Sequence, residues 1–203
     1  MWDEAKNTRI LQWAASQGAE VYGVDISESI VRLAHAEDVR IRAAVADCRR
    51  LPYSDESFDA VYSMGTIEHF DDSETAVAEM WRVLRPGGRA IVGVPNRRDP
   101  FLRPLLVAAL SAVGLYGYGY EKSYSRPALR SMIESLGFVV VAETAILFIP
   151  GWIRMFDLAC HAYAPALAWL GTALVKPFAW IDEHLPIVRR HGYLIVAVAE
   201  KPC

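Results

Sequence analysis

Six short apolar segments, separated by stretches with helical spacing, constrain the fold of this chain more than any other feature of its sequence. Several of the six are apolar at every position, which is typical of strands buried on both faces of a parallel sheet. The expected strands lie at residues 20–25, 39–46, 58–64, 89–95, 138–142 and 193–199. Because helical stretches alternate with them, the sequence predicts an α/β fold with a doubly wound sheet.

The stretches between the strands carry the end signals of amphipathic helices. Helices are expected at residues 9–17, 28–37 and 125–136, and a further one between the second and third of these. Ser27 is a good N-cap for the second helix, and Asp71 with Glu74 resembles a capping box that opens the additional one. That helix should stop at residues 86–88, which are Pro-Gly-Gly, and Gly137 should end the helix at 125–136 in the left-handed conformation.

Residues 144–189 differ in composition from the rest of the chain, because they are aromatic and apolar with few charges. The stretch separates the last two expected strands. We therefore interpret the 203 residues as a single domain, with a core at about 9–143 and 190–200 and an apolar insertion or cap at about 144–189.

Two apolar stretches, residues 104–120 and 158–175, approach the length of a membrane span. Their prolines and glycines, together with His161, favour core helices or helices that cap a substrate. If these helices are partly exposed, they suit a lipophilic acceptor or peripheral membrane contact.

The charge, the cysteine content and the N-terminal residues indicate which binding partners and which cellular compartment to expect. The chain has 21 basic and 24 acidic residues without a stripe of Lys and Arg among aromatic residues, so nothing indicates a nucleic-acid partner. Cys48, Cys160 and Cys203 are far apart and lack the spacing of a zinc site, and no metal is expected. Residues 1–6 lack the apolar region of a secretory signal, which predicts a cytoplasmic protein with membrane association as the alternative.

Three of the expected strands are followed by polar or small residues at their carboxyl ends, where ligands bind in open parallel sheets. Asp25 ends the first strand, and its carboxylate can accept two hydrogen bonds from a ribose diol. Asp47 follows the second strand and can accept from an adenine amino group. Ser63 and Met64 precede Gly65, where small residues let a ligand approach the backbone. For either aspartate, capping of the next helix is an equally good interpretation.

The order of several segments resembles the class I S-adenosylmethionine-dependent methyltransferases that act on small molecules. The segments are GAEVYGVDIS, ADCRRLPYSDESFDAVYS, IEHFDD and EMWRVLRPGGRAIVGVPN, and the resemblance covers residues 9 to about 142. Each segment alone is unspecific, whereas their succession is not.

The resemblance implies S-adenosylmethionine as the cofactor and assigns contacts to six residues. They are Asp25 at the ribose hydroxyls, Ile26 against the adenine face, Asp47 at the adenine amino group, Cys48 near the ring through its backbone, and Ser63 and Met64 beside the methionine moiety. The LRPGG segment at residues 84–88 is expected to be a structural turn between a helix and the next strand.

One part of the family pattern is missing or degenerate. The family opens with a strand that ends in a Gly-x-Gly-x-Gly loop, which would fall here at residues 4–8, and these contain no glycine. Residues 1–3 are too few for the strand, since strands usually run about five or six residues. We therefore expect either a truncated chain or a degenerate relative. Loss of a central strand leaves two sheet edges unpaired, which predicts low stability or association.

Candidate catalytic and substrate residues lie after the third expected strand and before the last core helix. His69, in the IEHF segment, is the candidate general base for an oxygen or carbon nucleophile. A packing or capping histidine is the alternative, and Glu68 has the same ambiguity. Tyr120 and Tyr124 lie where relatives carry a lid over the substrate, and a solvated loop is the alternative there.

These expectations lead to one main hypothesis and two rivals. The main hypothesis is methyl transfer from S-adenosylmethionine to a small, lipophilic acceptor. The sequence predicts neither the identity of this acceptor nor its target atom. The first rival is a noncatalytic remnant that binds a partner or a membrane through residues 144–189. The second is a nicotinamide-dependent oxidoreductase, since an acidic residue after a strand also suits that cofactor. The sequence leaves the oligomeric state open.

Overall fold

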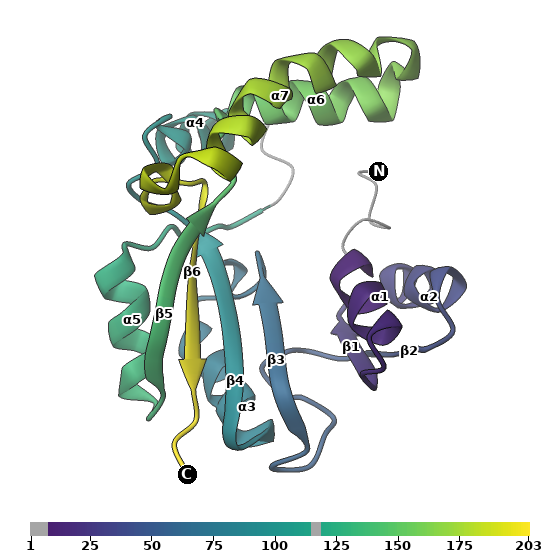
Figure 1. The fold of residues 1–203 in the computed structure, drawn as a ribbon, viewed down its shortest axis with the longest axis vertical. Coiled ribbons are helices and arrows are strands. Elements are labelled where there is room, and N and C mark those ends of the chain that lie inside the picture. Colours follow the sequence, from purple (N-terminus) through teal and green to yellow (C-terminus); the bar gives the residue numbers. More distant parts are fainter. Residues whose placement is uncertain (1–7, 115–118) are drawn as a thin grey trace. The chain divides into compact units, whose positions relative to one another are not determined.

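The computed structural model describes residues 8–114 and 119–203, which form two compact units with the boundary between Tyr53 and Ser54 (Figure 1). Residues 1–3 and all but the last residue of the expected glycine-loop segment, 4–8, lie outside the described residues.

The first unit contains a two-stranded parallel sheet and two helices. These elements are α1 (Arg9–Ser16), β1 (Val21–Asp25), α2 (Glu28–Glu37) and β2 (Ile41–Val45). The strands pair in register, with Asp25 opposite Val45. A small core of Ala15, Val21 and Ile41 holds α1 against the sheet.

The second unit contains a four-stranded sheet in the order β3-β4-β6-β5. Its strands are β3 (Phe58–Met64), β4 (Leu84–Pro95), β5 (Val139–Ile146) and β6 (Leu194–Glu200). The expected strands are thus confirmed as strands, but the last one runs antiparallel to β4 and β5. The reason is that the chain leaves the sheet at Ile146 and returns opposite it at Leu194, so β6 starts at the edge where β5 ends.

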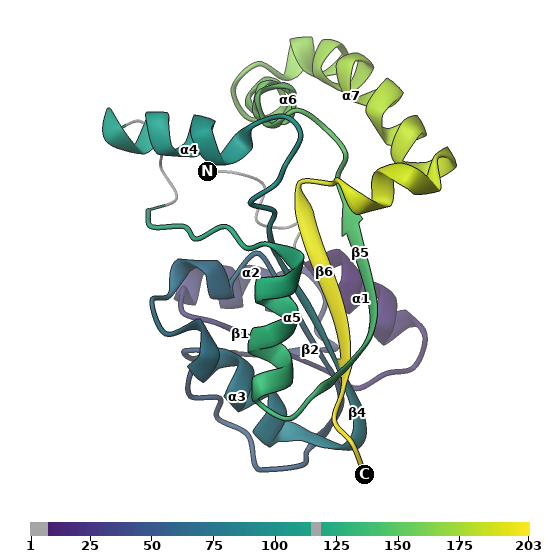
Figure 2. The ribbon, with the colours of Figure 1, turned by 90° about the vertical axis from the view of Figure 1, so that its left-hand side faces the viewer.

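Two helices of the second unit pack on one face of this sheet (Figure 2). They are α3 (Ser73–Val83) and α5 (Arg126–Ser135). Their apolar positions are buried, as the helical spacing predicts, together with the inward side chains of the strands. The core side chains include Val77, Met80, Val83, Leu129, Ile133, Val92, Val94 and Ile195.

Local details at the ends of these helices differ from expectation in two places. The capping box is wrong, because α3 begins after Asp72 without a side-chain cap, and Ser73 Oγ bonds instead to the carbonyls of Ile67 and Phe70. The LRPGG segment is part of a strand, because Leu84 already pairs with Phe58 and opens β4. Both ends of α5 are as predicted, since Ser125 Oγ accepts a hydrogen bond from Ala128 N at 3.3 Å and Gly137 has a left-handed φ of +97°.

Three further helices gather at one end of the second unit (Figures 1 and 2). They are α4 (Arg103–Ala112), α6 (Gly151–Tyr163) and α7 (Ala168–His184), accompanied by short 3-10 turns at η3 (Pro165–Leu167) and η4 (Pro186–Arg190). The apolar stretch at 158–175 is therefore broken between α6 and α7. Within the described ranges, no helix is both long and apolar enough to cross a membrane.

Each of two strands has an unpaired edge within its own unit. In the part of the chain that the structure describes, β1 pairs with β2 alone and β3 with β4 alone. The low stability or association expected from such edges stays a prediction.

Candidate functional site

The carboxyl edge of the β1–β2 sheet brings together four of the predicted cofactor residues. Asp25 Oδ1 accepts a hydrogen bond from Ser27 N at 2.8 Å, and the Asp25 carbonyl accepts from Ala46 N at 3.0 Å. Among the described residues, the second carboxylate oxygen of Asp25 has no hydrogen-bond partner. Next to it, Ile26 is 73% exposed. A carboxylate oxygen with open acceptor capacity beside an exposed apolar side chain fits a nucleoside, whose hydroxyls donate and whose ring is apolar on its face.

Asp47 lies at the same edge and is already engaged by a neighbour. Arg49 Nη2 lies 2.6 Å from Asp47 Oδ2, and Arg49 N donates to Asp47 Oδ1 at 2.9 Å. These bonds lower the pKa of Asp47 and keep it ionised. Arg49 would therefore compete with an adenine amino group for the same oxygens.

Cys48, next to Asp47, is half-buried. Burial, with a smaller contribution from the neighbouring Asp47 charge, raises the pKa of the Cys48 thiol to about 11. The thiol is therefore neutral at physiological pH and is no nucleophile, which is consistent with a contact through the backbone.

The carboxyl end of β3 places Ser63 and Met64 beside β4. Met64 pairs with Gly93 in the parallel ladder, and a Cβ added at Gly93 would lie 2.1 Å from Met64 Sδ. The Met64 side chain thus lies across Gly93. Gly65 N donates to the Gly93 carbonyl at 2.9 Å, and Gly65 has φ +73°, a conformation that favours glycine where the strand ends.

His69 follows this strand in the short 3-10 turn η2 (Ile67–His69) and has a fixed orientation. Its Nδ1 lies 2.7 Å from the backbone carbonyl of Tyr120. Because a carbonyl can only accept, Nδ1 carries the hydrogen, and the neutral ring has its lone pair on Nε2. This is the arrangement that a histidine general base requires.

Glu68, one residue earlier, is a buried carboxyl group. It is 3% exposed, and within the described chain its Oε2 has no hydrogen-bond partner. Its Oε1 faces Gly65, since a Cβ added there would lie 3.6 Å from it. Burial raises the pKa of Glu68 to about 7, although the nearby His69 and Arg103 act in the opposite direction. Glu68 can therefore hold a proton near neutral pH.

A buried ion pair lies close to this carboxyl group. Arg103 Nη1 and Nη2 donate to Glu121 Oε1 and Oε2 at 2.5 and 2.8 Å, and the two side chains are only 6% and 5% exposed. The guanidinium also stacks 4.3 Å from the ring centroid of Tyr193. This pair was not predictable from the sequence, because its members lie 18 residues apart in different elements and match no periodic spacing.

Residues 119–124 run as an extended segment between η2 and the end of β4. Lys122 N donates to the Glu68 carbonyl at 2.9 Å, and Tyr124 N donates to the Pro95 carbonyl at 2.8 Å. The Tyr124 hydroxyl lies 2.7 Å from Ser73 Oγ. Tyr124 is thus held by a backbone bond at the carboxyl edge of the four-stranded sheet, and the Tyr120 carbonyl is bonded to the His69 side chain.

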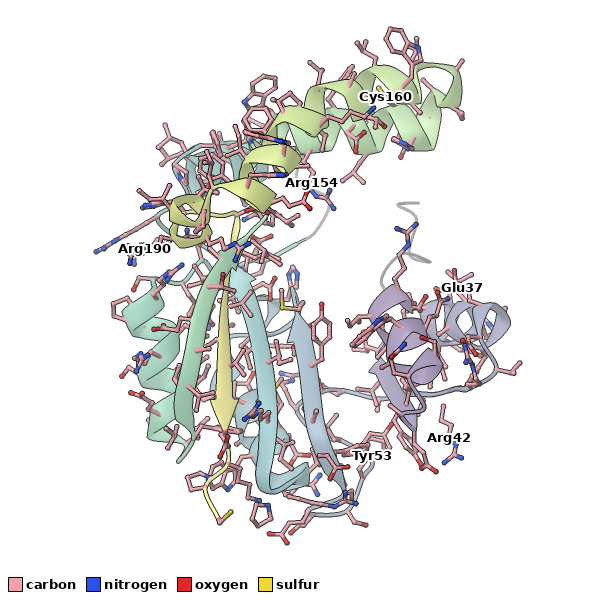
Figure 3. All side chains as sticks on the ribbon, in the orientation of Figure 1. Glu37, Arg42, Tyr53, Arg154, Cys160 and Arg190 are labelled. Carbon is pink, nitrogen blue, oxygen red and sulfur yellow. The ribbon has the colours of Figure 1, made fainter. Side chains whose placement is uncertain are left out.

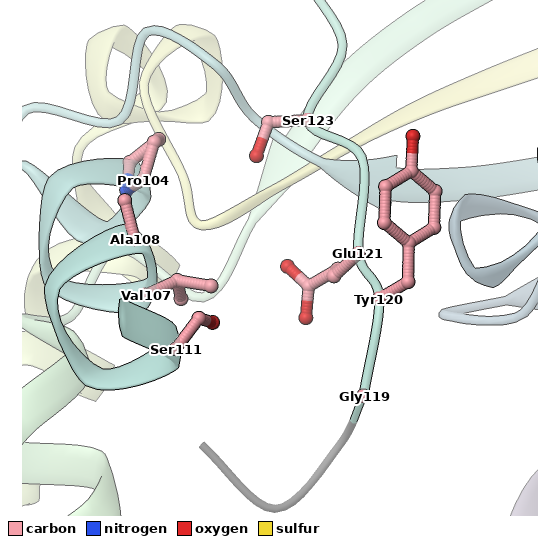
Figure 4. Close-up of a pocket in the computed structure, with 8 residues that line it drawn as sticks. All are labelled: Pro104, Val107, Ala108, Ser111, Gly119, Tyr120, Glu121 and Ser123. Carbon is pink, nitrogen blue, oxygen red and sulfur yellow. The ribbon is translucent and has the colours of Figure 1, made fainter. Parts of the chain in front are cut away.

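A pocket of about 410 Å³ lies between this extended segment and α4 (Figure 4). One wall is a face of α4 whose lining residues lie one, three or four positions apart in the sequence, and so on one side of the helix. The other wall is the extended segment. The lining residues are Pro104, Val107, Ala108, Ser111, Gly119, Tyr120, Glu121 and Ser123. Most of the α4 wall is apolar, and the polar groups come mainly from the opposite wall.

The predicted site residues therefore fall into two sets. Asp25, Ile26, Asp47 and Cys48 share one sheet edge in the first unit, and Ser63, Met64, His69, Tyr120 and Tyr124 share one in the second. In the described chain, no group of three or more His, Cys, Asp or Glu side chains could hold a metal ion.

Comparisons with known proteins agree on one family. A family model described as a methyltransferase domain matches residues 6–92. Methyltransferase GfsG of Streptomyces halstedii is 36% identical over 207 residues, and the match covers 94% of this chain and 69% of that protein. The chain belongs to the S-adenosylmethionine-dependent methyltransferases. S-adenosylmethionine is accordingly its cofactor, and the nicotinamide alternative is set aside.

Other methyltransferases support the assignment. The demethylmenaquinone methyltransferase of Thermus thermophilus is 34% identical over 146 residues, covering 62% of this chain and 66% of that protein. A Thermotoga maritima methyltransferase, described as a possible histamine N-methyltransferase, has a TM-score of 0.63 at 20% identity, covering 96% of this chain and 78% of that one. This likeness shows the Rossmann-like methyltransferase fold. The chain spans about two thirds of the length of the two curated relatives.

Proposed function

We propose that this methyltransferase transfers a methyl group to a small, lipophilic acceptor bound in the pocket beside α4. The observation that carries the proposal is the double role of Tyr120. Tyr120 is one of the residues that line the pocket, and its carbonyl accepts the Nδ1 hydrogen bond of His69. The same residue thus links the pocket wall to the oriented histidine.

The cofactor supplies an electrophilic methyl group on a sulfonium centre. We assign the nucleoside half to the edge that carries Asp25 and Ile26, with Asp47 and the Cys48 backbone near the adenine. Ser63 and Met64 at the end of β3 would lie beside the methionyl half. We also propose that residues 1–203 form one methyltransferase domain with the apolar insertion at 144–189.

The pocket chemistry supports an acceptor that is largely apolar with a polar end. Pro104, Val107 and Ala108 offer apolar surface, while Ser123 and the Glu121 carboxylate lie on the facing wall. Two curated relatives are named as demethylmenaquinone methyltransferases, which makes a lipophilic quinol-type acceptor the first class to test. In a pocket of this composition, burial of the acceptor supplies binding free energy, and the few polar groups orient the acceptor.

His69 would act on the proton that the acceptor loses. For an oxygen or carbon nucleophile, Nε2 accepts that proton as the methyl group is transferred, while the Tyr120 carbonyl stabilises the imidazolium through Nδ1. A nitrogen nucleophile with a free lone pair needs no base at that step. Positioning of the nucleophile in line with the methyl group then supplies most of the acceleration.

Calorimetry with S-adenosylhomocysteine tests the cofactor assignment. The parent chain is expected to bind in the micromolar range, about −8 kcal/mol. Loss of the charge-assisted bonds in Asp25→Ala should weaken binding by at least about tenfold. Asp38→Ala is the matched control, since Asp38 lies in the same unit and pairs with Arg40 away from this edge. Absence of heat from a folded parent chain would favour the noncatalytic alternative.

A further inference from the structure

We propose that α4, α6 and α7 form a docking surface for an anionic lipid bilayer. This surface, called the apolar cap below, consists of the exposed side chains of residues 102–113 and 151–184. The three helices lie at the same end of the second unit in both views (Figures 1 and 2). The start of α6 touches the first turn of α4, since a Cβ at Gly151 would lie 3.7 Å from Arg103 Cγ.

The outer face of α6 is apolar along its whole length. Trp152, Met155, Phe156 and Tyr163 follow one another at helical spacing and are all exposed, with Trp152 at 62% and Tyr163 at 74%. An amphipathic helix normally turns such a stripe toward the core. Here the stripe is turned to solvent.

The other two helices extend this surface. On α7, Trp169 and Trp180 are 68% and 56% exposed, one of them near each end of the helix. On α4, Leu105 is 66% exposed and is not among the residues that line the pocket, and residues 104–112 contain no charged residue. Exposed apolar area of this extent marks an interaction site, since large apolar side chains are seldom clustered on a free surface.

The composition of the cap favours a bilayer interface. Three of its exposed side chains are tryptophans and one is a tyrosine, and both residue types prefer the boundary between headgroups and hydrocarbon. In the described residues, no helix is suited to cross a membrane, so the cap would lie at this boundary.

Charge complementarity identifies the bilayer as anionic. The whole chain has a formal net charge of −3. In the cap and the residues that flank it in the chain, 97–113 and 151–190, the sign is reversed: exposed basic residues outnumber exposed acidic ones, with Arg97, Arg98, Lys176, Arg189 and Arg190 against Glu183. Figure 3 places Arg190 at the base of the α6–α7 hairpin and Cys160 toward its other end. Such an asymmetry orients the apolar cap toward negatively charged lipid headgroups.

The same charges disfavour a second copy of this chain as the occupant. A twofold dimer through the cap would bring the basic residues of one copy toward those of the other, which costs free energy. An anionic bilayer accommodates the tryptophans at its interface and attracts the basic residues to its negatively charged headgroups. Docking would also bring α4, which forms one wall of the pocket, to the lipid surface; this link to the acceptor rests on the proposed function.

Vesicle co-sedimentation without cofactor or acceptor tests the docking independently of methyl transfer. The full chain is expected to bind vesicles of equimolar phosphatidylcholine and phosphatidylglycerol, and to bind pure phosphatidylcholine more weakly. Combined Trp152→Gln, Phe156→Gln and Trp169→Gln should lower the partition coefficient by more than about tenfold. Trp13→Gln is the matched control, because Trp13 is 61% exposed on α1 and lies outside the cap.

Charge substitutions separate the electrostatic part. Arg97→Gln, Arg98→Gln and Lys176→Gln together should weaken binding to the anionic vesicles by about a hundredfold, at about 1 kcal/mol per basic residue. Arg32→Gln on α2 is the control and should leave binding to the anionic vesicles unchanged. The proposal is overturned if the folded chain binds neither vesicle, if Trp13→Gln weakens binding as much as the cap variant, or if sedimentation velocity shows a cap-dependent dimer without vesicle binding.

Discussion

Met64 occupies the space that a side chain at Gly93 would need, with its Sδ 2.1 Å from the position of a Cβ there. The two residues face each other in the parallel ladder between β3 and β4. The placement of a predicted cofactor residue therefore depends on a glycine in the neighbouring strand, because no other residue leaves room for the thioether.

Replacing this glycine should destabilise the protein through Met64. Gly93→Ala is expected to lower the free energy of unfolding by about 1–3 kcal/mol, because the thioether or the strand must move. Gly23→Ala in β1 is the control, since its Cβ would meet its neighbours at 3.7 Å or more. Denaturant titration measures both. In a Met64→Ala background the cost of Gly93→Ala should largely disappear, and an equal cost in both backgrounds would show that Met64 is not the cause.

Glu68 should make stability depend on pH. Its pKa is raised from 4.5 to about 7 in the folded protein, so folding favours the protonated form. The free energy of unfolding is therefore expected to fall as pH rises from about 4.5 to about 7 and to level off above, by up to about 3 kcal/mol.

Glu68→Gln should remove this component of the pH dependence and be more stable than the parent at pH values above that window. Glu74→Gln is the control, because Glu74 is exposed on α3. Denaturant titrations across the pH range compare the three proteins. Parallel pH profiles for the parent and Glu68→Gln would contradict the raised pKa.

The buried pair of Arg103 and Glu121 should be costly to break from one side. Glu121→Ala leaves a desolvated guanidinium and is expected to lower the free energy of unfolding by about 3–5 kcal/mol. The double variant Arg103→Met with Glu121→Met removes both charges and should cost much less. Arg130→Ala, which breaks an exposed ion pair with Glu143, should cost about 1 kcal/mol or less. Similar costs for Glu121→Ala and Arg130→Ala would argue against a desolvated pair.

The strands were predictable because each is a short, mainly apolar run bounded by polar or turn residues. Phe58–Met64 was predicted to the residue, and Ser125 and Gly137 were correctly placed at the two ends of α5. The reversed direction of β6 was not predictable in this way. It depends on the α6–α7 hairpin returning the chain to the edge where β5 ends, and strand direction leaves no trace in a pattern of apolar residues.

The candidate site was predictable only in part, for a related reason. Asp25 and Asp47 could be placed at one edge because parallel strands end together. Burial of Glu68 and the pairing of Arg103 with Glu121 depend on where α4 and residues 119–124 pack. Contacts between elements so far apart in the chain follow no short-range spacing, so sequence patterns do not predict them.

His69 and Tyr120 should affect different kinetic constants. With demethylmenaquinone as acceptor, His69→Asn removes the proton acceptor and should lower kcat by about a hundredfold while leaving the acceptor KM and S-adenosylhomocysteine binding near the parent values. Tyr120→Ala keeps the carbonyl that orients His69 but removes the side chain of a residue that lines the pocket, so it should raise the acceptor KM and change kcat little.

His161→Asn is the control for the histidine substitution, since His161 is exposed on α6. Steady-state assays over a range of acceptor concentrations give the two constants for each variant. Parent-level kcat in His69→Asn would exclude the base role, because no oxygen or carbon nucleophile could then depend on Nε2. A matching fall of kcat in Tyr120→Ala would instead mean that the Tyr120 side chain, and not its carbonyl alone, maintains the catalytic geometry.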